Sequence, residues 1–397
     1  MMTFSVAFPV MLGATALAVD SAAFYDQQSR MQSAADASAL AVAKELHVYR
    51  KNLGELEAVG KARVETLLAE AGIVERTHTS DVSIDGKDNL VAVTISMVSE
   101  TLLPIDVWGE NPIAVSSQAH AYGQSRLCVL ALDKDQSDTI KADGNASLNA
   151  PQCAVQSNSK DPSGLNVSSG SSLVSTVICT SGGSTGGGSM APPPETDCPR
   201  LDDPLASREP PAVGGCDFID EEIADDTTIS PGVYCGGLLI GDDAEVTAEP
   251  GIYVISGGNL KVSDEATLKG DNVSFYFEDD AATLDFKPGT TIDLSAPKDG
   301  AMAGILFYES RSAAVGRSFL IRSKNARRLL GTIYLPRGKL VIDVKGKVAD
   351  LSAYTVIVAK QLDVKGANLV INSDYGGTDV PVPDGVGPNS RMVMLNR

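Results

Sequence analysis

Hydrophobic residues follow three patterns along the chain, and each pattern predicts a different kind of element. Residues 2–19 are almost continuously apolar and carry no charged side chain, which approaches the length of a membrane-spanning helix. Residues 24–72 show helical spacing of apolar positions among many Ala, Leu, Glu and Lys residues. From residue 125 onward, short β-rich runs separated by Gly, Pro, Asn and Asp replace this pattern.

The apolar segment 2–19 is predicted to be a membrane anchor, in which Pro9 and Gly13 are tolerated. A cleaved signal peptide is the main alternative, because Ala16–Ala18 resembles a cleavage site, although no basic residues precede the segment. A buried core helix is a second alternative. Asp20 follows directly and is either an anchor at the helix interface or a charge that pairs with a neighbouring subunit.

The helical segment 24–72 is predicted to break near residues 52–54 and to end at Gly72. Mostly small residues share one stripe of this helix, which permits close packing against a sheet or another helix. The stripe consists of Met31, Ala35, Ala39 and Val42.

Strand-like runs follow the helix at residues 81–85, 89–98 and 113–123. A long, membrane-anchored helix packed on a short antiparallel sheet is typical of a pilin-like subunit. The N-terminal third is therefore predicted to be such a module.

Two repeats in the C-terminal two thirds predict a parallel β-helix. The motif Pro231–Tyr234 recurs as Pro250–Tyr253, an offset of 19 (250 − 231). Val344–Gly346 recurs as Val364–Gly366, an offset of 20 (364 − 344). Repeats of about 20 residues with strands and turns but no helix are typical of a β-solenoid.

Six cysteines without a C-x-x-C pair favour disulfides and an oxidising compartment over a zinc site. In a β-helix, cysteines one coil apart in sequence are close enough to bond. The 19-residue spacing (198 − 179 and 235 − 216) therefore predicts two pairs, and the remaining two cysteines make a third. The predicted pairs are Cys179 with Cys198, Cys216 with Cys235, and Cys128 with Cys153.

The charge balance excludes binding to nucleic acid by charge. Lys and Arg total 32 against 51 Asp and Glu, so the net charge is -19 and repels phosphate backbones. The three histidines, His47, His78 and His120, all lie in the first third, so the C-terminal half cannot hold a histidine triad.

Three motifs could carry chemistry, and each has a simpler interpretation. Residues 182–186 match G-x-S-x-G, but they sit in a Ser/Gly-rich stretch with no later histidine, which favours a linker. Four acids at Asp133–Asp143 lack the spacing of an EF-hand and are interpreted as a solvated turn. The arginines at Arg311–Arg328 near the acids at Glu278–Asp285 could suit a pectate-lyase-like enzyme. Only 5% of residues are aromatic, which is poor for a sugar-stacking cleft, so the basic stretch is interpreted as a contact surface.

The N-terminal residues resemble a known family. The motif Ala18-Val19-Asp20, followed by Arg30, Gln32 and the run Ala34-Ala35-Asp36-Ala37, is similar to the N-terminal signature of TadE/TadG-like proteins of Flp (tight-adherence) pilus assembly. Residues 102–121 and several C-terminal segments also resemble larger TadG-like proteins. The resemblance implies assembly roles for Asp20, Arg30 and Asp36.

Together these observations predict an α+β chain: a membrane-anchored pilin-like helix with a small antiparallel sheet, followed by a disulfide-braced parallel β-helix. The predicted boundaries are 1–21 for the anchor, 22–124 for the pilin-like module, 125–180 for the first coils, 181–215 for a Gly/Ser/Pro-rich insert and 216–397 for the main β-helix.

The expected function is that of a non-enzymatic Tad/Flp pilus component on the outer side of the inner membrane, with no cofactor and no metal. The expected partners are other pilus subunits, the inner-membrane assembly platform, the membrane itself and a surface glycan or other adhesion substrate. The alternative is a β-helix protein that binds or cleaves polysaccharide.

Overall fold

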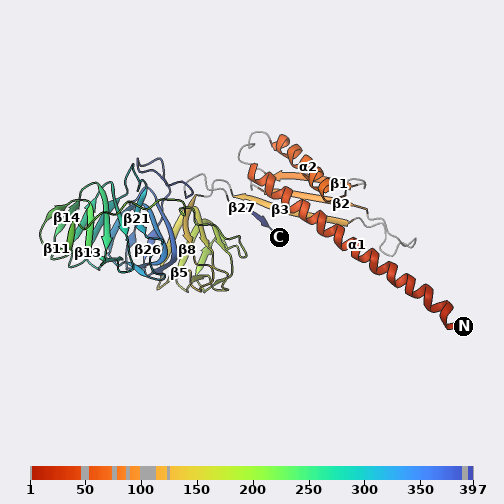
Figure 1. Ribbon diagram of the computed structural model, residues 1–397, viewed down its shortest axis with the longest axis horizontal. Helices are drawn as coiled ribbons and strands as arrows, with labels where there is room; N and C mark the ends of the chain where they lie inside the picture. Colours follow the sequence, from red (N-terminus) through yellow and green to blue (C-terminus); the bar gives the residue numbers. More distant parts are fainter. Residues whose placement is uncertain are drawn as a thin grey trace. The chain divides into compact units, whose positions relative to one another are not determined.

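The computed structural model describes residues 2–45, 53–73, 78–85, 90–98, 113–122, 126–386 and 392–396. The chain forms two compact units, one of Met1–Gln124 with Arg391–Arg397 and one of Ser125–Ser390. The second unit is inserted between β3 (Ile113–Tyr122) and β27 (Met392–Asn396), two strands that pair with each other in the first unit (Figure 1). The range 216–397 expected for the main β-helix is therefore too long, because β27 belongs to the first unit.

The first unit packs two helices on one four-stranded antiparallel sheet. The helices are α1 (Met2–Glu45) and α2 (Leu53–Glu70). Of the break expected near residues 52–54, residue 52 lies outside the described residues and residues 53 and 54 belong to α2. The sheet order is β1 (His78–Asp85), β2 (Leu90–Met97), β3 and β27. The strands β1 to β3 correspond to the three strand-like runs of the sequence.

The packing of the first unit depends on small residues, as predicted. Met31, Ala35 and Ala39 on α1 have no exposed surface. A Cβ atom on Gly60 of α2 would lie 2.9 Å from a methyl group of Val42, so only glycine lets the two helices approach this closely. Gly72 ends α2 with a φ of 77°, and the N–H of the next residue, Ile73, donates to the Leu68 carbonyl at 2.9 Å.

The second unit is a parallel β-helix in which short strands of one coil pair in parallel with strands of the next. Residues 126–191 form a first coil block with β4 (Leu127–Ala131), β5 (Ile140–Asp143), β6 (Ser147–Ser157), β7 (Leu165–Val167), β8 (Ser172–Thr180), β9 (Ser184–Thr185) and β10 (Ser189–Ala191).

Residues 218–372 form a second coil block with more coils. Its strands are β11 (Phe218–Ile223), β12 (Thr227–Ile229), β13 (Gly232–Ile240), β14 (Glu245–Ala248), β15 (Gly251–Ser256), β16 (Leu260–Val262), β17 (Thr267–Gly270), β18 (Val273–Phe277), β19 (Leu284–Phe286), β20 (Thr291–Ser295), β21 (Ile305–Glu309), β22 (Ser318–Ile321), β23 (Asn325–Asp343), β24 (Lys347–Val348), β25 (Thr355–Lys365) and β26 (Asn368–Val370).

The coils stack in an order that differs from the order of the chain. The second block winds from β11 to β25, and β25 then pairs with β4, with Ile357 opposite Val129. From β4 the stack continues through β6 and β8 to β10. The first coil in sequence and the last coil in sequence are therefore neighbours inside the stack.

The core of the β-helix is a column of inward side chains, aromatic in the second block. The rings of Tyr253 and Phe275 lie 5.1 Å apart, and those of Phe275 and Phe307 lie 6.0 Å apart. Three strands, β4, β18 and β21, are buried along their whole length, so their outward side chains are covered as well. A second layer must therefore cover this side of the coils.

Candidate functional site

Residues 192–217, the strap, connect β10 at one end of the stack to β11 at the other and cross the outside of the coils. Successive residues of the strap contact successive coils of the stack. Asn158, next to β6, donates to the Leu201 carbonyl at 2.7 Å. Tyr334 of β23 donates to Asp203 at 2.6 Å, and Tyr308 of β21 donates to the Arg208 carbonyl at 2.8 Å. The strap thus contacts both coil blocks and joins them.

Two arginines fix the strap more firmly. Arg208 in the strap donates to the carbonyls of Ala301 and Ala303 at 3.1 and 3.2 Å. Arg311, from the loop after β21, donates back to the strap carbonyls of Leu205 and Arg208 at 3.3 and 2.7 Å. This part of the strap is therefore held by a network that includes charged donors.

The tyrosines beneath the strap act as hydrogen-bond donors. Burial raises the pKa of Tyr308 to about 12, and burial together with the Asp203 carboxylate also raises the pKa of Tyr334. Both phenols therefore keep their protons at neutral pH and can donate to the strap.

The cysteines form three disulfides, and these are the pairs that the cysteine spacing predicts. They are Cys128–Cys153, Cys179–Cys198 and Cys216–Cys235, with Cα atoms 5.5, 6.0 and 5.7 Å apart. The first joins neighbouring coils of the first block. The other two join the two ends of the strap to the coils beneath.

The Gly-rich residues of the expected insert 181–215 are not a linker. β9 and β10 in this stretch pair in parallel with β7 and β8 and form the last coil of the stack. A Cβ atom on Gly183 would lie 2.2 Å from the Pro162 carbonyl oxygen, and one on Gly186 would lie 2.0 Å from that of Val167. The glycines of the G-x-S-x-G motif thus permit close contact between coils, and the linker interpretation is wrong.

The arginines at 311–328 are paired inside the protein, which does not support the free basic contact surface expected there. Arg317 contacts Glu309 at 2.6 Å, and the Glu309 side chain has no exposed surface. Arg322 contacts Asp285 at 2.6 Å. Arg327 pairs with Asp350, and Arg328 with Asp293.

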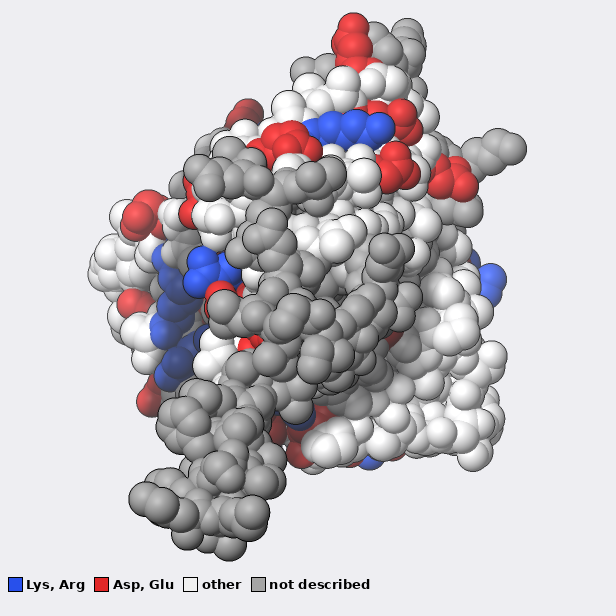
Figure 2. Space-filling model, turned by 90° about the vertical axis from the view of Figure 1, so that its right-hand side faces the viewer, with Lys and Arg blue, Asp and Glu red and all other residues white. Residues whose placement is uncertain are grey.

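Three of the acids that could have served a lyase-like site, Asp279, Asp280 and Asp285, accept hydrogen bonds or form ion pairs. Asp279 accepts hydrogen bonds from the backbone N–H groups of Gly257, Ala281 and Ala282 at 2.6 to 3.0 Å. These bonds lower the pKa of Asp279 although partial burial acts to raise it. Figure 2 shows acidic and basic side chains interspersed on one face of the molecule, beside broad uncharged areas.

The acids at 133–143 are only partly a solvated turn. Asp133 is buried and pairs with Lys360 of β25 at 2.7 Å, whereas Asp135 is exposed. Lys141 pairs with Asp143 at 3.2 Å. Since Lys360 belongs to the second block, the pair with Asp133 holds the two blocks together.

One cluster among the described residues has the geometry of a metal site. It consists of Cys179, Glu195 and Cys198, and both of its sulfur atoms are joined in a disulfide. These thiols are therefore not available as ligands in the oxidised protein.

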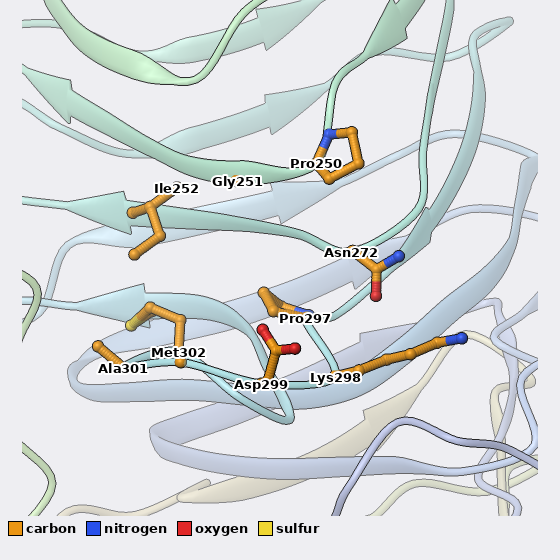
Figure 3. A pocket seen from close by; sticks show the side chains of 10 residues that line it. Pro250, Gly251, Ile252, Asn272, Pro297, Lys298, Asp299, Ala301 and Met302 are labelled. Carbon is orange, nitrogen blue, oxygen red and sulfur yellow. The ribbon is translucent and has the colours of Figure 1, made fainter.

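A cavity of about 430 Å³ lies on the second block between β15 and the loop that precedes β21 (Figure 3). Ile252 and Met302 line one side of the cavity, and Asn272 and Asp299 add polar groups. Lys298, at the same loop, pairs with Asp379 at 3.3 Å. Lys298 and Asp299 are the two ionisable residues among those that line the cavity.

The three predicted assembly residues lie along α1. Arg30 donates to the Ala71 carbonyl at 3.0 Å, beyond the end of α2, and pairs with Asp26 at 2.9 Å. Asp36 accepts a hydrogen bond from Gln32 at 2.8 Å. Asp20 is 8% exposed. Sequence reasoning did not single out Asp26, although its spacing to Arg30 is that of a helical ion pair.

Most side chains of the predicted anchor 2–19 lie outside the described residues, although its backbone belongs to α1. Within the described part of the chain, we find no helix that is both long and apolar enough to cross a membrane. His47 and all of residues 102–112, including Trp108, also lie outside the described residues.

Comparison with known proteins matches the N-terminal residues to one family. Residues 1–45 match a family model described as "Putative Flp pilus-assembly TadE/G-like". This segment is similar to the TadE/G-like family. The resemblance noted in the sequence is thereby confirmed for these residues. Neither the curated proteins nor the solved structures gave a match.

The TadE/G-like segment ends where α1 ends, at Glu45, and includes Asp20, Arg30 and Asp36. The match indicates a role related to the Tad pilus, and together with the disulfides it indicates an extracytoplasmic protein. The β-helix lies outside the matched residues, so its role has to be argued from its own structure.

Proposed function

We propose that this chain is a non-enzymatic, extracytoplasmic component of a Flp pilus assembly system that presents a strapped β-helix on a TadE/G-like helix. The observation that carries the proposal is the match of residues 1–45, which fold as one helix whose inner stripe packs on the sheet of the first unit. The β-helix is then an inserted domain whose two ends join neighbouring strands of that sheet.

Attachment to the inner membrane through residues 2–19 is part of the proposal. The support is the lack of charged side chains in this segment and its position ahead of the part of α1 that packs on the sheet. The partners would be other pilus subunits and the inner-membrane assembly platform, in contact with the N-terminal part of α1. Tyr25, which is 69% exposed, is available for such a contact.

A non-enzymatic role agrees with how the charged groups are used. Most of the arginines and acids that could have formed a lyase-like site bond to each other or to backbone groups, as described for Arg317, Arg322 and Asp279. These side chains stabilise the coil stack, and a substrate would have to displace those bonds.

Binding to a surface polysaccharide is a second candidate, favoured by one observation on the first coil block. Residues 162–194 carry no charged side chain, and outward positions on neighbouring strands are Ser147, Ser172 and Ser189. An uncharged surface of hydroxyl groups on a chain of net charge -19 suits a neutral glycan.

Deletion of the gene followed by complementation tests the main proposal. Wild-type protein should restore surface pili, and a chain lacking residues 1–45 should not. Tagged protein should be found with membranes or sheared pili and not in the cytosol. Normal pili in the deletion strain, or a cytosolic protein, would contradict the proposal.

A further inference from the structure

The three disulfides differ in how accessible they are to a thiol. Cys128 and Cys153 have no exposed surface, and Cys179 and Cys198 are 1% and 6% exposed. Cys216, in contrast, is exposed, and Cys235 is partly exposed. Thiol–disulfide exchange requires direct approach of a thiolate to a sulfur atom, so access alone separates the Cys216–Cys235 bond from the other two.

The part of the strap next to Cys216 is also its least supported part. Up to Arg208 the strap is held by the hydrogen bonds described above, but within the described structure we find none made by residues 209–215. Most side chains of this stretch are exposed, and only Pro211 is buried. Gly214 and Gly215 have no neighbouring atoms where a Cβ would be placed. After this stretch, the Cys216–Cys235 bond is the first attachment to the coils, followed by Asp217, whose N–H donates to the Val233 carbonyl at 3.0 Å.

We propose that Cys216–Cys235 is a reducible clasp that releases residues 209–216 of the strap when an external dithiol attacks it. A thiolate of the dithiol attacks the Sγ of the exposed residue Cys216, the S–S bond breaks, and Cys235 leaves as a thiolate and takes up a proton. The second thiol of the reductant then attacks the mixed disulfide. Cys216 leaves as a thiol, and the reductant is oxidised to a disulfide.

Reduction of the Cys216–Cys235 bond frees the strap only at the β11 end of the stack. The remainder of the strap stays bound to the coils. The Cys179–Cys198 bond, the pair of Asn158 with Leu201 and the Arg208 contacts still hold residues 198–208 on both coil blocks. Only the stretch that leads into β11 becomes free. Because β11 is the end strand of the stack, reduction alters the edge that this end presents to a partner.

Stepwise reduction of the folded full-length chain tests the proposal. The protein is titrated with limiting dithiol, alkylated with N-ethylmaleimide and mapped by peptide mass spectrometry. We expect Cys216 and Cys235 to be labelled while the other four cysteines remain unlabelled. Cys179–Cys198 is an internal control, because it has the same sequence separation of 19 and also anchors an end of the strap.

Limited proteolysis supplies an independent measurement. An elastase-type protease should cut after Ala212 or Val213 in the reduced chain much faster than in the oxidised chain. The double variant Cys216→Ser/Cys235→Ser should be cut at the fast rate without reductant, whereas Cys179→Ser/Cys198→Ser should still require it. Simultaneous labelling of all six cysteines, earlier labelling of another pair, or cleavage that ignores reductant would overturn the clasp.

Discussion

The two coil blocks of the β-helix have the same coil geometry but are stabilised by different means. The second block stacks aromatic side chains along its core, from Phe218 through Tyr234 and Tyr253 to Phe275 and Phe307. The first block has no aromatic residue, because none occurs between residues 123 and 217. It contains instead the Cys128–Cys153 disulfide and half of the Cys179–Cys198 disulfide.

The difference indicates that covalent bonds in the first block take the place of the large apolar area that aromatic rings bury in the second. Coils of Ser, Gly, Asn and Val bury less area per residue than coils with Phe and Tyr. Disulfides stabilise through the unfolded chain and so need no large side chains. Each substitution below removes a ring, a disulfide or a hydroxyl group from one block. The loss of unfolding free energy then measures how much that group stabilises its block.

The largest effect is expected for Phe307→Ala in the second block. Phe307 is fully buried in the inward column, so the lost burial and the remaining cavity should reduce the free energy of unfolding by about 3–5 kcal/mol. Urea unfolding measures the change. Ile178→Val, in the same column of the first block, is the control and should cost only about 0.5–1.5 kcal/mol. Equal losses of unfolding free energy in the two variants would contradict the claim that buried aromatic rings stabilise the second block.

The next largest effect is expected for Cys128→Ser/Cys153→Ser in the first block. Loss of a cross-link with a sequence separation of 25 should cost about 3 kcal/mol in the loop-entropy account. Thermal melts of the oxidised variant and of wild type measure the cost. Reductant should lower the melting temperature of wild type toward that of the variant. An unchanged melting temperature would show that the first block does not need its internal disulfide.

A smaller effect is expected for Tyr253→Phe, which keeps the ring and removes its hydroxyl. The hydroxyl bonds to the carbonyls of Ile229 and Glu249 at 2.9 and 2.8 Å, so its loss should cost about 1 kcal/mol. A cost as large as that of Phe307→Ala would mean that hydrogen bonds, and not ring burial, stabilise the second block.

The smallest effect is expected for Ser172→Ala, on the outward side of the first block. Its hydroxyl bonds to that of Ser147 at 3.2 Å and the residue is partly exposed, so the free energy of unfolding should change by less than about 0.5 kcal/mol. Chemical denaturation measures the change. A larger loss would show that the outward serine hydroxyls also stabilise the first block.

Local sequence patterns predicted the elements and the disulfides well, because both depend on short-range spacing. The repeat of Pro231–Tyr234 marks neighbouring coils, and the same period places Cys216 beside Cys235. The helix stripe around Ala35 was predictable because helical spacing decides which side chains share a face.

The order of the coils was not predictable from those patterns. The edge of any coil offers the same backbone hydrogen bonds. The local sequence therefore does not predict that β25 pairs with β4, more than 200 residues away in sequence. The return of β27 to the first sheet is non-local for the same reason.

The hydrophobic pattern of some strands indicates that a further layer, here the strap, covers them. Runs such as Val273–Phe277 and Ile305–Glu309 are apolar at nearly every position, whereas a strand with one solvated face alternates. Such runs indicate a covering layer but do not say which segment supplies it. The contact surface expected at Arg311–Arg328 is not supported, because Arg322, Arg327 and Arg328 pair with acids on neighbouring coils, which local sequence does not reveal.

Hydrogen exchange, followed by mass spectrometry on oxidised and fully reduced protein, tests most directly whether the two blocks are stabilised by different means. We expect reduction to lower the protection of β4 to β8 in the first block, while β15, β18 and β21 in the second block keep theirs. Equal loss of protection in all coils, or loss confined to the aromatic coils, would contradict our account.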